Sequence, residues 1–106
     1  MNTTKQDLIA ARRLIEVPGT WCQHNGHTVT PEGVNQYCLL GAIDRVTDSV
    51  HTLANNGAPS RYNAARAVVV AMLGPSGMFP VTWNDLKGRT QAEVLELLDK
   101  AIEAAA

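Results

Sequence analysis

Residues 21–43 read WCQHNGHTVTPEGVNQYCLLGAI and join the first predicted helix to the rest of the chain. The stretch holds both cysteines, two of the three histidines and the dipeptide Asn25-Gly26. Asn-Gly is the preferred pair for a two-residue hairpin turn, because both turn positions require a positive φ. We therefore predict a small β-hairpin with strands 20–24 and 27–30.

On both sides of the hairpin, apolar residues recur at helical spacing. The pattern predicts about four helices, at 4–16, 36–53, 61–73 and 91–105. Thr4 and Asn35 are expected to cap the first two helices, and Thr90 to Glu93 form a capping box for the last. The helix at 61–73 is apolar on most sides and is expected to be central and the most buried. Residues 75–89 read as a connection with a short strand at Val81–Trp83.

The chain has 106 residues, 45% of them hydrophobic and 18% charged, which is typical of a globular protein. Its length predicts one domain, residues 1–106. Because helical segments outnumber strands, the expected fold is mainly α, within the α+β class, with one small hairpin. A broadly apolar helix is also compatible with a homodimer.

The charge balance excludes some functions. Nine Lys and Arg face ten Asp and Glu, for a net charge of -1, so bulk charge does not favour a nucleic-acid partner. No apolar run is long enough to span a bilayer, and the N-terminus lacks a signal peptide pattern. A cytoplasmic location with reduced cysteines is expected. The sequence contains no glycine-rich loop of the kind that binds nucleotide phosphates. No cofactor is therefore expected.

A metal site is a weak prediction. The expected hairpin puts Cys22, His24 and His27 on one face, and ten residues separate His27 from Cys38. Cysteine and histidine are the usual zinc ligands, but this spacing matches no zinc motif. Histidines beside a turn are commonly exposed, and a cysteine is commonly a small core residue.

A cysteine nucleophile is the second chemical hypothesis. Cys38 is expected in the first turn of its helix, where amide dipoles lower the pKa of a thiol. His24 or His27 would be the base, oriented by Asn84 or Asp85. The alternative is a buried thiol without a chemical role.

A third candidate site is the segment Trp83, Asn84 and Asp85 with Arg89. Tryptophan and arginine are common anchors of binding sites. The structural alternative has Trp83 closing one end of the core while Asn84 and Asp85 accept hydrogen bonds from nearby amides.

Several short motifs are distributed over nearly the whole chain. They are Leu8 to Ile15, Trp21, Cys38-Leu39-Leu40-Gly41-Ala42, Trp83-Asn84-Asp85, and Arg89 through Ile102. In these motifs the chain resembles a small bacterial and phage family of uncharacterised function. The resemblance implies no activity, but it suggests that Cys38 and Trp83-Asn84-Asp85 meet in space. Cys22, His24 and His27 lie outside the pattern, which weakens a metal site common to the family.

Taken together, the residues favour a non-enzymatic binding or regulatory module that contacts another protein. If the gene is carried by a phage, that partner would belong to a host system. The alternative is a hydrolase or transferase that uses Cys38, and a weaker alternative is a hairpin stabilised by zinc.

Overall fold

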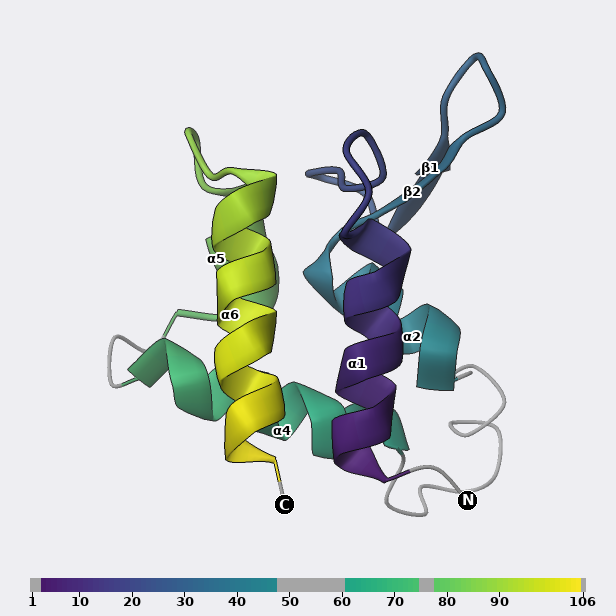
Figure 1. Cartoon of the computed structure of the whole chain (residues 1–106). Helices are drawn as coiled ribbons and strands as arrows, with labels where there is room; N and C mark the ends of the chain where they lie inside the picture. The colour runs from purple at the N-terminus through teal and green to yellow at the C-terminus, as the bar shows by residue number, and fades with distance from the viewer. Residues whose placement is uncertain (1–2, 48–60, 75–77, 106) are drawn as a thin grey trace.

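The computed structural model describes residues 3–47, 61–74 and 78–105. Within them lie five helices and two strands (Figure 1). In chain order these are α1 Thr4–Ile15, β1 His27–Val29, β2 Asn35–Tyr37, α2 Leu39–Thr47, α4 Arg61–Leu73, α5 Pro80–Asp85 and α6 Gln91–Ala104. The mainly α fold with one small antiparallel hairpin is therefore confirmed. None of the described helices is long and apolar enough to cross a membrane.

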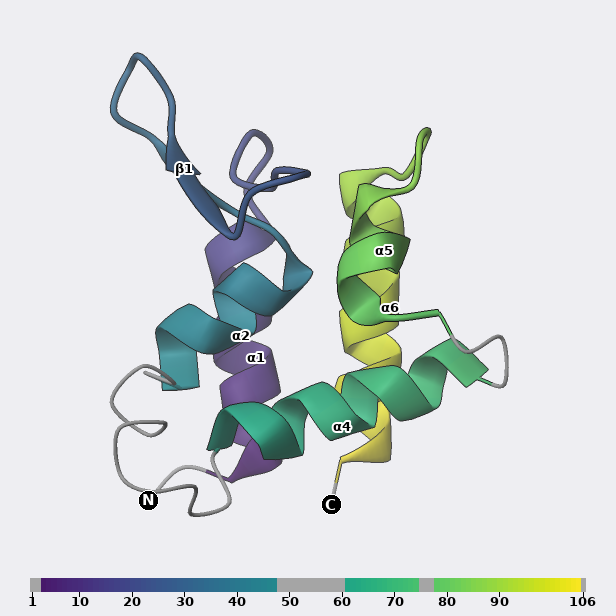
Figure 2. The same cartoon turned by 180° about the vertical axis from the view of Figure 1, so that it is seen from behind.

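Helix α1 lies at the centre of the packing, in contact with α2, α4 and α6. Its inner face is formed by Leu8, Ala11 and Ile15, which are completely buried. The prediction that the helix at 61–73 is central is wrong. That helix, α4, buries only two residues completely, and it crosses α1 and α6 near one end of the molecule (Figure 2). Its alanines and valines are small enough to face water at little cost.

Both long terminal helices begin with a capping box. Thr90 and Glu93 cap α6 as predicted, with the Thr90 hydroxyl accepting from Glu93 N and Glu93 Oε1 accepting from Thr90 N. At α1 the cap is Thr3, paired with Gln6, and the prediction of Thr4 is wrong by one residue. The buried Asp7 carboxylate forms an ion pair with Arg61 at 2.6 Å, which joins α1 to α4.

The hairpin uses different strands from those predicted. β1 pairs with β2, with His27 opposite Tyr37 and Val29 opposite Asn35. The predicted pairing of 20–24 with 27–30 is therefore wrong. The Asn25-Gly26 pair does not form the expected turn, because the positive φ of 70° lies at His24.

The observed hairpin includes residues that were predicted to begin the second helix. Because Asn35 and Gln36 belong to β2, Asn35 is not a helix cap, and α2 begins at Leu39. The end of the predicted helix 36–53, from residue 48 onward, lies outside the described residues. The predicted strand at Val81–Trp83 is also wrong, since those residues lie in α5, which starts with Pro80 at its first position.

Candidate functional site

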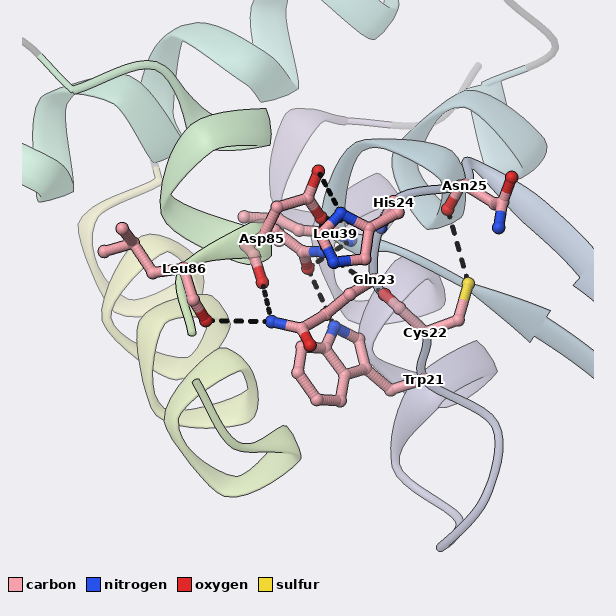
Figure 3. Close-up of polar contacts among 9 residues, drawn as sticks. Trp21, Cys22, Gln23, His24, Asn25, Leu39, Asp85 and Leu86 are labelled. Carbon is pink, nitrogen blue, oxygen red and sulfur yellow. Dashed lines mark hydrogen bonds and ion pairs between the residues drawn. The ribbon is translucent and has the colours of Figure 1, made fainter. Parts of the chain in front are cut away.

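Asn84 is completely buried and joins three segments that are distant in sequence. Its Oδ1 accepts hydrogen bonds from Trp21 Nε1 at 2.7 Å and from Leu39 N at 3.1 Å. Its Nδ2 donates to Cys22 O at 3.2 Å and to Asp85 Oδ1 at 2.9 Å. Figure 3 shows Trp21, Cys22, Leu39 and Asp85 gathered around this network.

The Asn84 side chain acts as the cap of α2. Leu39 N is one of the amides that a helix start leaves without an internal partner. Its partner is a side chain 45 residues further along the chain. The start of α2 and the Trp83-Asn84-Asp85 motif therefore meet, as the family resemblance suggests.

Residues 22–26, here called loop 22–26, are held against α2 and α5. Gln23 Nε2 donates to Asn84 O at 3.0 Å and to Leu86 O at 2.9 Å. His24 N donates to Asp85 Oδ1 at 2.9 Å. These contacts hold His24 in its left-handed conformation, which costs energy in a residue other than glycine.

The close approach of this loop to α2 depends on Gly41. A Cβ atom at Gly41 would lie 1.8 Å from the backbone oxygen of Gly26. The same oxygen accepts a hydrogen bond from Cys38 N at 3.2 Å. Loop 22–26 therefore forms a fixed wall beside the start of α2.

A cavity of about 260 Å³ opens beside this wall. It is here called the polar cavity after its histidine and aspartate side chains, although most of its lining surface is apolar. It is lined by His24, Asn25, Gly26, Cys38, Leu40, Gly41, Asp44, Tyr62, Val81 and Asp85. Cys38, His24 and Asp85 thus surround one space, and His24 Nδ1 lies 3.9 Å from Asp85 Oδ2. His24 has a side chain 72% exposed, whereas Cys38 is buried.

Burial raises the pKa of the Cys38 thiol, and hydrogen bonds from the amides of Gly41 and Leu40 only partly offset it. The predicted lowering of this pKa at a helix start is therefore wrong, because loss of water outweighs the favourable amides. Burial and the neighbouring Cys38 raise the pKa of Cys22 to about 11. Burial also tends to raise the pKa of Asp85, but hydrogen bonds from His24 N and the Asn84 side chain lower it overall.

The weak metal candidates are engaged in other contacts. Cys22 Sγ lies 3.3 Å from Asn25 O, and the His27 ring stacks on Tyr37 with centroids 4.7 Å apart. Over residues 3–47, 61–74 and 78–105, no three His, Cys, Asp or Glu side chains gather in a way that could hold a metal ion. The predicted shared face of Cys22, His24 and His27 depended on the wrong hairpin.

A second cavity has a volume of about 340 Å³ and lies between α4, α5 and α6. It is here called the apolar groove after its methionine, leucine and tryptophan side chains, although polar and apolar atoms line it in nearly equal shares. It is lined by Met72, Leu73, Met78, Trp83, Glu93, Glu96, Leu97 and Lys100. The Arg89 guanidinium stacks on Trp83 at 4.0 Å from the ring centroid and pairs with Glu93 at 3.0 Å. Helix α5 therefore presents Trp83 to the groove and Asp85 to the polar cavity.

The four predicted binding residues do not share a single site. Trp83 lines the groove, with Arg89 stacked on its ring, while Asp85 lines the polar cavity. Asn84 is buried between them with both its amide atoms hydrogen-bonded, so it has no surface to offer a ligand.

Sequence reasoning missed the methionines of the groove and the exposed Phe79. Phe79 directly precedes Pro80 at the start of α5 and is 67% exposed. A large aromatic residue just before a helix-starting proline was the available signal. Tyr62 and Asp44 of the polar cavity carried no comparable signal, because helical periodicity does not reveal which loop faces them.

The chain is a mainly α protein with a small hairpin and a cavity on each side of α5. It belongs to a family of unknown function (DUF6197), whose model matches residues 1–104. This membership is consistent with the resemblance to an uncharacterised family of small domains and adds no activity to it. Searches among curated proteins and among solved structures found no match.

Proposed function

We propose that this protein is a small binding module that receives an apolar segment of another protein in the apolar groove. The proposal rests on the groove together with an exposed aromatic residue beside it. Met78 lines the groove, and Phe79, the next residue in the chain, is exposed. Methionine side chains adapt their shape to different apolar partners. Trp83 adds a rigid aromatic surface of the kind that anchors protein contacts.

The charges around the groove indicate the character of the partner. Glu93 is paired with Arg89, and Glu96 with Lys100 at 3.6 Å. The rim thus offers no excess charge of either sign, and an apolar segment without a charge cluster fits it best. Binding should therefore depend weakly on salt, because screening acts mainly on unbalanced exposed charges. A cytoplasmic regulatory role, on a host component if the gene is phage-borne, is part of this proposal.

The proposal can be tested by comparing two surface variants in capture from cells that express the protein. Phe79→Glu places a charge beside the groove, and Val29→Glu places one on the hairpin, at a side chain 54% exposed. We expect a partner that is recovered with the wild type and with Val29→Glu but not with Phe79→Glu. Equal recovery by all three forms, or no partner at all, would contradict the proposal.

A cysteine-dependent hydrolase or transferase is the second candidate. It is favoured by one observation, the arrangement of Cys38, His24 and Asp85 around the polar cavity. The raised pKa of Cys38 opposes it, since a thiol must ionise before it attacks.

The rate of alkylation separates the two candidates. In a Cys22→Ser background, iodoacetamide reports on Cys38 alone. An enzyme requires Cys38 to react faster than a free thiol of pKa about 8.5 at neutral pH. We expect Cys38 to be alkylated more slowly than a free thiol. Faster alkylation would instead favour an enzyme that uses Cys38 in the polar cavity.

A further inference from the structure

Cys22 and Cys38 occupy matching positions on neighbouring extended segments. Cys22 N donates to Tyr37 O at 3.1 Å, and Tyr37 N donates to Thr20 O at 2.9 Å. These two bonds set Trp21 opposite Tyr37 in a parallel bridge. The next residue on each segment is a cysteine.

The geometry of a parallel pair brings these two cysteines close. Neighbouring strands lie about 4.8 Å apart, and successive side chains point to opposite faces. The observed bridge pairs Trp21 with Tyr37 alone. If the alternation continues for one residue on each segment, Cys22 and Cys38 lie together on the opposite face. A disulfide spans Cα separations of about 4.4–6.8 Å, a range that includes the ordinary strand spacing of about 4.8 Å.

Both thiols are free, and the hydrogen bonds that hold them are weak and local. Cys22 Sγ donates to Asn25 O at 3.3 Å, a bond drawn as a dashed line in Figure 3. Cys38 Sγ accepts from Gly41 N at 3.2 Å. Rotation of the two side chains toward each other gives up these bonds and the hydrogen bond from the Leu40 amide to Cys38.

We propose that Cys22 and Cys38 are a modification site, at which a small disulfide such as oxidised glutathione forms a reversible intramolecular disulfide. Cys22 is the more exposed of the two thiols. Because its pKa is raised to about 11, only a small thiolate fraction attacks one glutathione sulfur and the step is slow. The first glutathione leaves as a thiolate that takes up a proton. The Cys38 thiolate then attacks Cys22 Sγ and displaces the second glutathione. Two protein thiols are oxidised, one glutathione disulfide is reduced, and both protein protons end on glutathione.

The modification would act on the polar cavity. Cys38 lines that cavity, and Cys22 begins the loop that forms its wall. A covalent bond between them ties loop 22–26 to the start of α2. The inference does not depend on the proposed binding function, which concerns the other side of α5.

The test is equilibration of the native protein with mixtures of reduced and oxidised glutathione, followed by acid quenching and mass spectrometry. We expect a monomer that loses two hydrogen atoms and carries no glutathione. The equilibrium constant for disulfide formation should be at least about tenfold higher in the native protein than in concentrated urea, because folding holds the thiols together.

A displaced cysteine gives the matched control. The double variant Cys22→Ser with Val29→Cys has a thiol nearer to Cys38 in sequence but on the opposite strand, β1, paired with Asn35. Its disulfide should form at least as readily as the Cys22–Cys38 disulfide in urea, and less readily in the native protein. Three results would overturn the proposal. They are a wild-type equilibrium constant for disulfide formation that is no higher in the native protein than in urea, a stable glutathione adduct at Cys22, and a disulfide-linked dimer.

Discussion

On one side of α5, Asn84 and Asp85 are held by hydrogen bonds to loop 22–26 and α2, whereas on the other side Trp83 is held by packing and by Arg89. Oriented hydrogen bonds accept one geometry, and a buried amide left without a partner costs about 1–3 kcal/mol. Apolar contacts tolerate small shifts of their partners. The difference indicates that the polar side fixes the local structure, while the groove side tolerates small shifts of its residues.

The largest expected effect tests whether the polar side is structural. Replacing Asn84 by Ala leaves Trp21 Nε1, Leu39 N and Cys22 O without their partner. We expect the free energy of unfolding to fall by about 3–5 kcal/mol, measured by urea denaturation. The control Asn25→Ala removes an exposed amide side chain and should change it by less than about 0.5 kcal/mol. A loss below about 1 kcal/mol for Asn84→Ala would mean that water replaces the network.

The second prediction uses the two glycines that meet where loop 22–26 touches α2. Gly41→Ala should destabilise the protein by about 2 kcal/mol, although alanine favours a helix by about 1 kcal/mol, because its Cβ collides with a backbone atom. At Gly26 the nearest atom would be 4.0 Å from a new Cβ, so Gly26→Ala should cost under about 1 kcal/mol. Melting temperatures of the two variants give the comparison. A Gly41→Ala protein more stable than wild type would show that the loop moves away freely.

On the groove side, Arg89→Gln removes the stacking on Trp83 and the ion pair with Glu93. We expect a loss of about 1 kcal/mol in urea denaturation, because the guanidinium side chain is only 15% exposed. The matched control is Lys100→Gln, which breaks an exposed pair with Glu96 and should cost about 0–0.5 kcal/mol. Equal losses in the two variants would argue that the stacking contributes nothing.

The smallest effect is a pH dependence at Asp85. Because its folded pKa lies below the ordinary value of 3.8, the charged form stabilises the protein above that pH. Asp85→Asn should be less stable than wild type by about 0.5–1 kcal/mol at pH 7, since the amide is a weaker acceptor. This gap should shrink as the pH falls through the folded pKa and the wild-type carboxylate gains a proton. A gap that stays constant down to about pH 2.5 would contradict the lowered pKa.

Local signals predicted what depends on neighbours along the chain. The helices α1 and α6 followed from apolar spacing, and the α6 cap from Thr90 and Glu93. Even here the α1 cap was predicted one residue too late, although Thr3 and Gln6 have the spacing of a capping box, which identifies Thr3 in the sequence.

The hairpin shows how a local rule fails. Asn25-Gly26 favours a two-residue turn, but loop 22–26 is held by Gln23 on Leu86 and by His24 on Asp85, more than 60 residues away. These bonds, together with the β1–β2 ladder, outweigh the preference of one dipeptide. The grouping of the candidate binding residues into one site was wrong for the same reason. The structure divides its residues, Trp83 and Asp85, between two cavities, and the sequence does not show which segments line each cavity.

By itself the sequence determined the mainly α class, the terminal helices and, through its family motifs, the meeting of the α2 start with Trp83-Asn84-Asp85. The tertiary structure alone decided the partner of each strand, the capping of α2 by Asn84, the surroundings of Cys38 and the two cavities beside α5. Helix periodicity and caps act within a few residues, so they are written locally. Hydrogen-bond partners, burial and the resulting pKa shifts depend on groups that only folding brings together.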